Sequence, residues 1–228
     1  MRSNPLYLTL VVSLVLLASG CASYTPSSAP VPDASAIQLK QANRGVEAGA
    51  DVYVEEERQK AIFDANLDEA GVIAIQVLAK NKTKRRMLVR PTDMVLTLQN
   101  GRAISTAGVN SVVNKVGEDG SVVGAALAFG IIGMLAASSA EEEARTARTE
   151  DYKHKAFKEV TLAPGQSGHG FVFFIPPPGT PDFNHATLRV RFVDSDTAKS
   201  RSVQLALRDL GFVKAEKKGA ERTEKYDN

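Results

Sequence analysis

The sequence predicts a mainly β protein that folds as an antiparallel sandwich of two sheets. Many short segments are rich in β-branched and aromatic residues, and glycine, proline or asparagine separates them at short intervals, which is typical of sandwiches. A chain of 228 residues can build one sizeable core, so a single folded domain is expected. Because the chain has one cysteine, packing rather than a disulfide framework must hold that core together.

Two patterns identify the strands most clearly. Residues 72–79 form an uninterrupted apolar run between Gly71 and Asn81, which is typical of a central strand buried on both faces. Residues 186–193 alternate between apolar and polar side chains, which is typical of a half-buried strand. Further strands are expected at residues 87–90, 94–98, 102–106, 157–162, 170–175 and 202–207, and residues 46–54 could form another.

Turn residues indicate how these strands connect. Gln99, Asn100 and Gly101 predict a tight hairpin turn, because Asn-Gly accepts positive φ angles. The strands between residues 72 and 106 are therefore expected to follow one another as an antiparallel meander. A short amphipathic helix is expected before them, at residues 55–66, where apolar side chains recur at helical spacing.

Seven to eight short strands joined by such turns fit an immunoglobulin-like sandwich, although the chain lacks the cysteine pair and the tryptophan of a true immunoglobulin domain. The sandwich domain is predicted to span residues 45–213. It contains an inserted helical arm, rich in glycine and alanine, at residues 109–155. Residues 214–228 are mostly charged or small and are expected to be disordered.

The N-terminus predicts a signal peptide at residues 1–20. Arg2 supplies a positive charge, and residues 6–17 are apolar over the length of a signal peptide core rather than of a membrane span. Small residues then precede Cys21, and this pattern resembles the lipobox of bacterial lipoproteins. The resemblance implies that Cys21 becomes the first residue of the mature chain and carries lipid such as palmitate. An ordinary secretory peptide with an incidental cysteine is the alternative.

The residues after Cys21 extend this resemblance. Ala22 and Ser23 lack the aspartate that the family associates with retention at the inner membrane, so the resemblance implies an outer-membrane lipoprotein facing the periplasm. Residues 21–44 are predicted to form a flexible tether, because their first part is rich in serine, proline and alanine. The order of the predicted strands also resembles poorly characterised envelope lipoproteins that carry one immunoglobulin-like sandwich and a glycine-zipper-like insertion.

The inserted arm contains an unusual segment, residues 121–140, which has no charged side chain and the length of a membrane span. Small residues recur in it every four positions, so a helix here would have one smooth face that lets another backbone approach closely. This spacing resembles a glycine zipper. The residues predicted for membrane contact or self-association are Gly120, Gly124, Ala128, Gly130 and Gly133.

The arm must leave the sandwich and return to it on the same side of any bilayer, because strands are expected both before and after it. Residues 141–155 are too charged to be a returning span and predict a solvated helix. Three alternatives remain open for residues 121–140. They are a re-entrant hairpin that bends near Phe129, a hairpin that covers its own sandwich, and a helix that associates with copies of itself.

The sequence contains no convincing constellation for catalysis or metal binding. His154, His169 and His185 lack neighbouring ligands at metal-site spacing, so no metal and no cofactor are expected. Ser167 lies in a Gly-x-Ser sequence, but His169 occupies the position of the second glycine of a nucleophile elbow. A hydrolase is therefore only a weak alternative.

The clusters of charged residues do not require a ligand-binding site, because charged residues on a solvated surface explain them more simply. Residues 141–143 and 194–196 contain acidic side chains that could hold calcium, but a helix start and an exposed turn account for them. A basic cluster could face anionic lipid headgroups or form the charged rim of a hairpin. Its members are Lys82, Lys84, Arg85, Arg86 and Arg90.

The leading functional prediction is a lipid-anchored, non-enzymatic cell-envelope protein that binds or positions partners through its sandwich and its glycine-rich arm. The alternative is a membrane-active or self-oligomerising module built on the glycine-zipper segment. The expected partners are membrane lipid, through acylated Cys21, and either an envelope protein or a second copy of the chain. Nucleic acid is not an expected partner, because the formal net charge is only +2.

Overall fold

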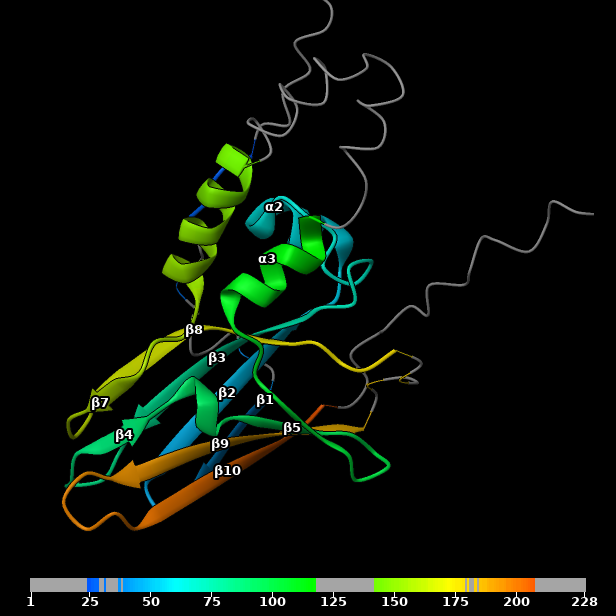
Figure 1. The fold of residues 1–228 in the computed structure, drawn as a ribbon. Helices are drawn as coiled ribbons and strands as arrows, with labels where there is room; N and C mark the ends of the chain where they lie inside the picture. Colours follow the sequence, from blue (N-terminus) through cyan, green and yellow to red (C-terminus); the bar gives the residue numbers. More distant parts are fainter. Residues whose placement is uncertain are drawn as a thin grey trace, which may run out of the picture.

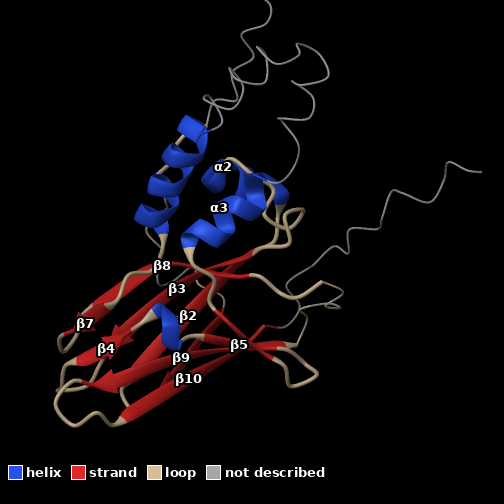
Figure 2. Cartoon of the chain, in the orientation of Figure 1, coloured by secondary structure: helices blue, strands red, loops and turns tan. Residues whose placement is uncertain are grey.

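The computed structural model describes residues 24–28, 31, 37, 39–117, 142–178, 180, 183 and 185–207. These residues form two antiparallel sheets that face each other, with helices on the outer side of one sheet (Figures 1 and 2). The predicted signal peptide, Cys21, the five predicted small-residue sites between Gly120 and Gly133, and residues 214–228 lie outside the described residues.

The first sheet has the strand order β1-β2-β3-β8. The predicted central strand is confirmed, because β3 lies between β2 and β8 and is buried along most of its length. The bounds of these strands are β1 Leu39–Asn43, β2 Val46–Tyr53, β3 Ile73–Asn81 and β8 Ser167–Phe174.

The second sheet has the order β6-β5-β9-β4-β7, and β10 pairs with the other edge of β9. One edge of β9 accommodates two short strands in succession, with Phe192 opposite Val89 of β4 and Leu188 opposite Leu96 of β5. A short 3-10 helix, η1 (Pro91–Asp93), lies between β4 and β5. The strands are β4 Met87–Val89, β5 Val95–Thr97, β6 Ala103–Ser105, β7 Val160–Leu162, β9 Ala186–Asp194 and β10 Ser200–Leu207.

The main core lies between the two sheets and follows the predicted alternation. In β9, every second residue points inward, and Leu188, Val190 and Phe192 are fully buried. In β3, the residues on one face join this core, whereas Ala74 on the opposite face joins a second apolar cluster beneath the helices. The β-sandwich prediction is therefore confirmed, and the finer immunoglobulin-like assignment stays a prediction.

The predicted meander between residues 72 and 106 is wrong. β3 belongs to the first sheet, whereas β4, β5 and β6 belong to the second, and only β5 and β6 form a hairpin. The polar residues 82–86 carry the chain from one sheet to the other across the end of the sandwich. Gly101 has a φ of 82°, as the predicted hairpin turn requires.

The predicted tether at residues 21–44 also needs correction, because part of it is structured. β1 pairs with β2 from Leu39 to Asn43, and the two strands are joined by Arg44 and Gly45. Both joining residues have positive φ angles, 48° and 83°, which is the geometry of a two-residue hairpin turn. Arginine rarely adopts this conformation, so the local sequence did not indicate the turn.

A helical layer covers one end of the outer face of the first sheet, where β3 begins (Figures 1 and 2). It consists of α2 (Glu56–Phe63), which confirms the predicted helix at residues 55–66, of α3 (Val109–Gly117), and of a helix at residues 142–155. The last helix is only partly solvated, contrary to the prediction, because two of its own residues are buried, Tyr152 at 0% and Lys155 at 4% exposure. No helix within the described residues is both long enough and apolar enough to cross a membrane.

Candidate functional site: the helical layer and the N-terminal strap

The helical layer is held on the sheet by a cluster of aromatic side chains. Phe171 and Phe173 are two residues apart on β8, so both point toward the helices, while Val172 and Phe174 point into the sandwich core. Phe63, the last residue of α2, lies at the centre, with ring centroids 4.9 Å from Phe171 and 5.2 Å from Tyr152 in edge-to-face geometry. Such pairs add packing energy beyond their buried area.

α2 is fixed to the sheet by a buried glutamine. The Gln59 side chain donates a hydrogen bond to the carbonyl oxygen of Tyr53 at 2.8 Å. Its own carbonyl oxygen accepts hydrogen bonds from the backbone amides of Leu67 at 2.6 Å and Asp68 at 3.2 Å. One side chain therefore joins the end of β2, α2 and the loop that follows, which explains why a polar residue is tolerated at a fully buried position.

The helix at residues 142–155 satisfies the C-terminal end of α2. The last carbonyls of a helix have no partner within it and carry partial negative charge. The Tyr152 hydroxyl donates to the carbonyl oxygen of Phe63 at 2.8 Å, and the Lys155 ammonium donates to that of Ile62. Lys155, only 4% exposed, also pairs with the Asp151 carboxylate one turn earlier. The buried Lys155 ammonium therefore has two partners, the Asp151 carboxylate and the C-terminal end of α2.

Residues 24–28, which we term the N-terminal strap, dock against this junction. The Ser27 hydroxyl donates to the carbonyl oxygen of Ile62 at 2.8 Å and accepts from Lys155 at 3.3 Å. The Thr25 amide donates to the Asp64 carboxylate at 3.1 Å. The strap therefore lies between the end of α2 and the helix at residues 142–155, three residues after Cys21 in the sequence.

Tyr24 makes the most extensive contacts of the strap. Its hydroxyl donates to Asp151, its ring lies 6.4 Å from that of Tyr152, and the Arg148 guanidinium lies over the ring at 5.1 Å. Burial, followed by the hydrogen bond to Asp151, raises the pKa of Tyr24, so the hydroxyl stays protonated as a donor. The Arg148 Nε is buried without a hydrogen-bond partner among the described residues.

The two helices that flank residues 118–141 also contact each other. The Arg145 guanidinium donates to the Asn114 side chain of α3 at 3.4 Å and to the Glu142 carboxylate at 3.0 Å. α3 contributes Val112 and Val113 to the apolar cluster beneath the helical layer. The arm therefore begins and ends on the same face of the first sheet, and both of its described ends are fixed there.

The three histidines of the chain lie on separate elements. His154 is exposed on the helix at residues 142–155, His169 is exposed on β8, and His185 lies in the turn before β9. Ser167 and His169 occupy exposed positions of a regular strand, whereas a nucleophile elbow needs a sharp turn from strand to helix. Among the described residues, no group of three or more histidine, cysteine or acidic side chains could hold a metal ion.

The acidic clusters form local contacts. Asp194 accepts hydrogen bonds from the backbone amides of Asp196 and Thr197, both at 3.0 Å, and pairs with Arg85 at 3.3 Å. Glu142 pairs with Arg145, and Glu141 lies outside the described residues. Both arrangements use their carboxylates to stabilise a turn or a helix start.

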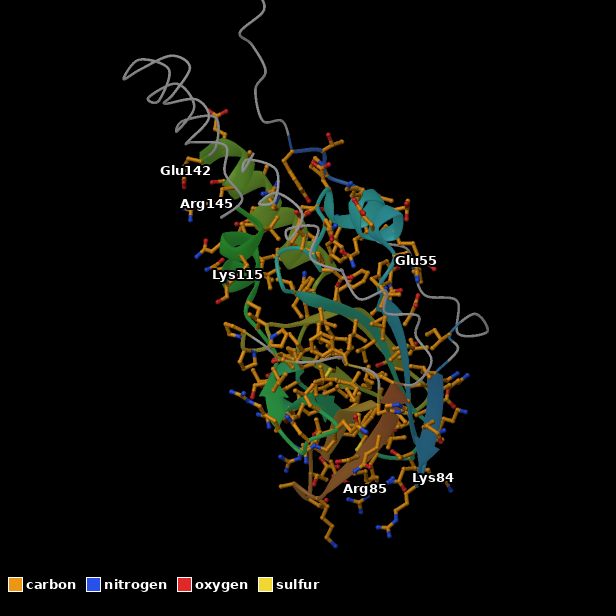
Figure 3. All side chains as sticks on the ribbon, turned by 90° about the vertical axis from the view of Figure 1, so that its right-hand side faces the viewer. Glu55, Lys84, Arg85, Lys115, Glu142 and Arg145 are labelled. Atoms are coloured by element: carbon orange, nitrogen blue, oxygen red, sulfur yellow. The ribbon has the colours of Figure 1, made fainter. Side chains whose placement is uncertain are left out.

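The predicted basic cluster lies at the end of the sandwich far from the helical layer, as the labels of Lys84 and Arg85 show (Figure 3). Lys82 pairs with Glu47 and Arg85 with Asp194, and Lys84 and Arg86 are exposed like these two. We term these four basic residues the basic tip. Arg90, the fifth predicted member, pairs with Asp93 beside η1.

A buried asparagine at the end of β3 organises the basic tip. The Asn81 side chain donates to the carbonyl oxygens of Arg85 at 2.7 Å and Leu162 at 2.9 Å. Its oxygen accepts from the amide and the hydroxyl of Thr83 at 2.9 and 2.7 Å. Sequence reasoning also missed Tyr24, Asp151 and Lys155. The only local signal was the spacing of four between Asp151 and Lys155, which favours a helical ion pair.

No family model matches this chain, and no curated protein sequence matches it. Similar chains are found among solved structures. One is the yjhA protein from Bacillus subtilis, at 11% identity and a TM-score of 0.40, over 74% of this chain and 97% of that one. Another is a functionally unknown protein from Listeria monocytogenes EGD-e, at 9% identity and a TM-score of 0.33, over 74% of this chain and 80% of that one.

Proposed function

We propose that this protein is a non-enzymatic component of a bacterial cell envelope, held at the membrane by lipid on Cys21, that binds or positions partners through its sandwich and the arm at residues 109–155. The observation that carries the proposal is the placement of both described ends of the arm. α3 and the helix at residues 142–155 pack on the same face of the first sheet. The two described segments that flank residues 118–141 are therefore both held on the same side of the sandwich.

The anchor follows from the lipobox-like residues before Cys21. Several acyl chains, at about 0.8 kcal/mol per buried methylene, hold a protein at a membrane without help from the rest of the chain. The sandwich domain is then not needed for membrane attachment and can serve recognition. An outer-membrane location facing the periplasm belongs to the same proposal and rests on the residues after Cys21.

The direct test compares two proteins that both lack residues 1–21. One has the native arm, and the other has residues 119–140 replaced by a Gly/Ser linker of equal length. We expect the native form alone to float with liposomes, to form oligomers by light scattering, or to capture a defined envelope protein. Identical behaviour of the two proteins in all three assays would contradict a role for the arm.

A second candidate function, self-oligomerisation, is favoured by the spacing of the small residues in the arm. Leucine at Gly124 and Gly130 would block close approach of two backbones. We therefore expect Gly124→Leu with Gly130→Leu to abolish oligomers. Ala125→Leu is the matched control, because it introduces the same side chain off the four-residue spacing. A protein that is monomeric under all conditions would exclude this function.

A further inference from the structure

The contacts of the N-terminal strap limit how the protein can be oriented on a membrane. This inference rests on the proposed acylation of Cys21. Tyr24 follows Cys21 by three residues, and an extended chain spans at most about 3.6 Å per residue. The lipid-bearing residue therefore lies within about 11 Å of the Tyr24 backbone. A free tether that ran from Cys21 to β1 would allow several times that distance.

The strap is held by several independent contacts. Tyr24 contacts Asp151, Arg148 and Tyr152, and the backbone and side chains of the next residues bond to Asp64 and Ile62. All of these partners belong to the helical layer. A docked strap therefore brings the anchor to the helical layer rather than to the sheets.

The basic tip lies at the opposite end of the molecule. The helical layer covers the part of the first sheet where β3 begins, near Ala74, whereas Asn81 at the end of β3 organises the tip. At about 3.3 Å per residue, these two positions are about 23 Å apart. Figure 3 shows Glu142 and Arg145 at one end of the protein and Lys84 and Arg85 at the other.

We propose that the N-terminal strap fixes the orientation of the protein on the bilayer, with the helical layer against the lipid headgroups and the basic tip directed away from the membrane. The exposed surface of the helix at residues 142–155 carries both signs of charge, including Glu143, Arg145, Glu150 and Lys153. It therefore has no strong preference for an anionic surface. The position of the anchor, and not a charged patch, determines which face meets the lipid.

The test measures the distance of two surface positions from the headgroups in the complete, lipidated protein. Acylation blocks the thiol of Cys21, so a cysteine introduced as Glu143→Cys or Lys84→Cys takes a fluorophore selectively. The labelled protein is reconstituted into phosphatidylethanolamine and phosphatidylglycerol vesicles that contain a headgroup-bound quencher. We expect several-fold stronger quenching at position 143 than at position 84.

The strap is tested by Tyr24→Ala combined with Ser27→Ala, which removes its main side-chain contacts without touching the sandwich core. We expect the difference between the two positions to disappear, while flotation with the vesicles persists. Ser28→Ala is the matched control, because Ser28 is exposed in the same segment, and it should leave the difference intact. Amide exchange of Thr25, whose N–H is bonded to Asp64, reports docking without lipid in a Cys21→Ser protein.

The outcomes separate this inference from the proposed function. Equal quenching at both positions in a protein that floats would overturn the fixed orientation and leave the anchor intact. A difference that survives loss of the strap contacts would overturn the role of the strap. A wild-type chain that does not float, and whose Cys21 carries no acyl group by mass spectrometry, would overturn the proposed anchor itself.

Discussion

Single buried polar residues determine how the elements of this protein are joined. Asn81, Gln59 and Lys155 are all buried, and each bonds to backbone groups of segments that are distant in the sequence or at the end of another element. A buried polar group that loses its partners costs more than the bond itself contributes. Substitutions at these residues should therefore have larger effects than substitutions at polar residues on the surface.

We expect Asn81→Ala to reduce the free energy of unfolding by about 2 to 4 kcal/mol, because the Leu162 carbonyl loses its side-chain donor and remains buried. Chemical denaturation of the chain from residue 22 onward provides the measurement. Asn100→Ala is the control, because Asn100 is exposed and accepts one local hydrogen bond at 3.0 Å. Equal losses for the two variants would contradict the role assigned to Asn81.

Glu47 should make stability depend on acid pH. Its hydrogen bond to Lys82, the largest cause, and its contacts with Lys40 outweigh burial and lower its pKa in the folded state. The ordinary pKa of glutamate is about 4.3, so Glu47 stabilises the fold above that value, and the contribution is lost as the pH falls through the lower folded pKa.

We expect Glu47→Gln to reduce stability at neutral pH by less than about 1 kcal/mol, since both lysines are partly exposed. When the free energy of unfolding is measured across pH, its decline below about pH 5 should be less steep in the variant than in the native protein. Glu57→Gln, at an exposed position of α2, provides the comparison. An unchanged acid slope in the Glu47 variant would refute the prediction.

At the scale of elements, the helix at residues 142–155 shows how composition can hide burial. Its sequence is densely charged, yet one face contributes Tyr152 and Lys155 to the junction with α2 and the strap. The chain leaves this helix alongside β8, where the Phe157 amide bonds to the Phe171 carbonyl at 2.8 Å. Docking of the helix and packing of β8 are therefore linked.

We expect Lys155→Met to weaken the junction by about 3 to 5 kcal/mol, because the largely buried Asp151 carboxylate and the Ile62 carbonyl lose the ammonium that pairs with them. Hydrogen exchange should increase in residues 142–155 more than in β3. Lys153→Met is the control, since Lys153 forms an exposed pair with Glu150 on the same helix. Similar exchange in the two variants would argue against the junction.

Gly170 permits the close approach between β8 and the segment that leaves this helix. A Cβ atom at Gly170 would lie 2.5 Å from the Cα of Phe157 and 2.6 Å from its nitrogen, both backbone atoms. We expect Gly170→Ala to destabilise the protein by about 3 kcal/mol in thermal or chemical unfolding. Gly117→Ala should be nearly neutral, because no atom of the described residues lies within 4 Å of its added methyl group.

At the scale of the whole molecule, the described residues by themselves supply a continuous core between the sheets and an apolar cluster beneath the helices. The two sheets are also joined directly, for example by the Asn43 side chain, which donates to the carbonyl oxygen of Ser202 at 2.9 Å. We therefore expect residues 119–140 to be dispensable for folding.

We expect the protein whose residues 119–140 are replaced by a Gly/Ser linker to unfold cooperatively, within about 1 kcal/mol of the native chain. Circular dichroism during denaturation measures this, while flotation and light scattering report the loss of interaction. A large loss of stability in the replaced protein would show instead that the arm covers its own sandwich.

The sequence by itself predicted the mainly β sandwich, the position of α2 and nearly every strand after it. These features follow from local patterns, such as the alternation in β9 and the apolar run in β3, and a local pattern can be recognised without knowing its partner. The candidate anchor at Cys21 is also a local motif, and it stays a prediction.

Three features became visible only in the tertiary structure. They are the assignment of strands to the two sheets, the turn at Arg44 and Gly45, and the docking of the strap on the helical layer. Each of these depends on surfaces that are far apart in the sequence. Tyr24 and Asp151 are separated by 127 residues, and nothing near either one indicates the other. Burial of Lys155 is likewise determined by the end of α2, because a cation can be buried only where carbonyls and a carboxylate receive it.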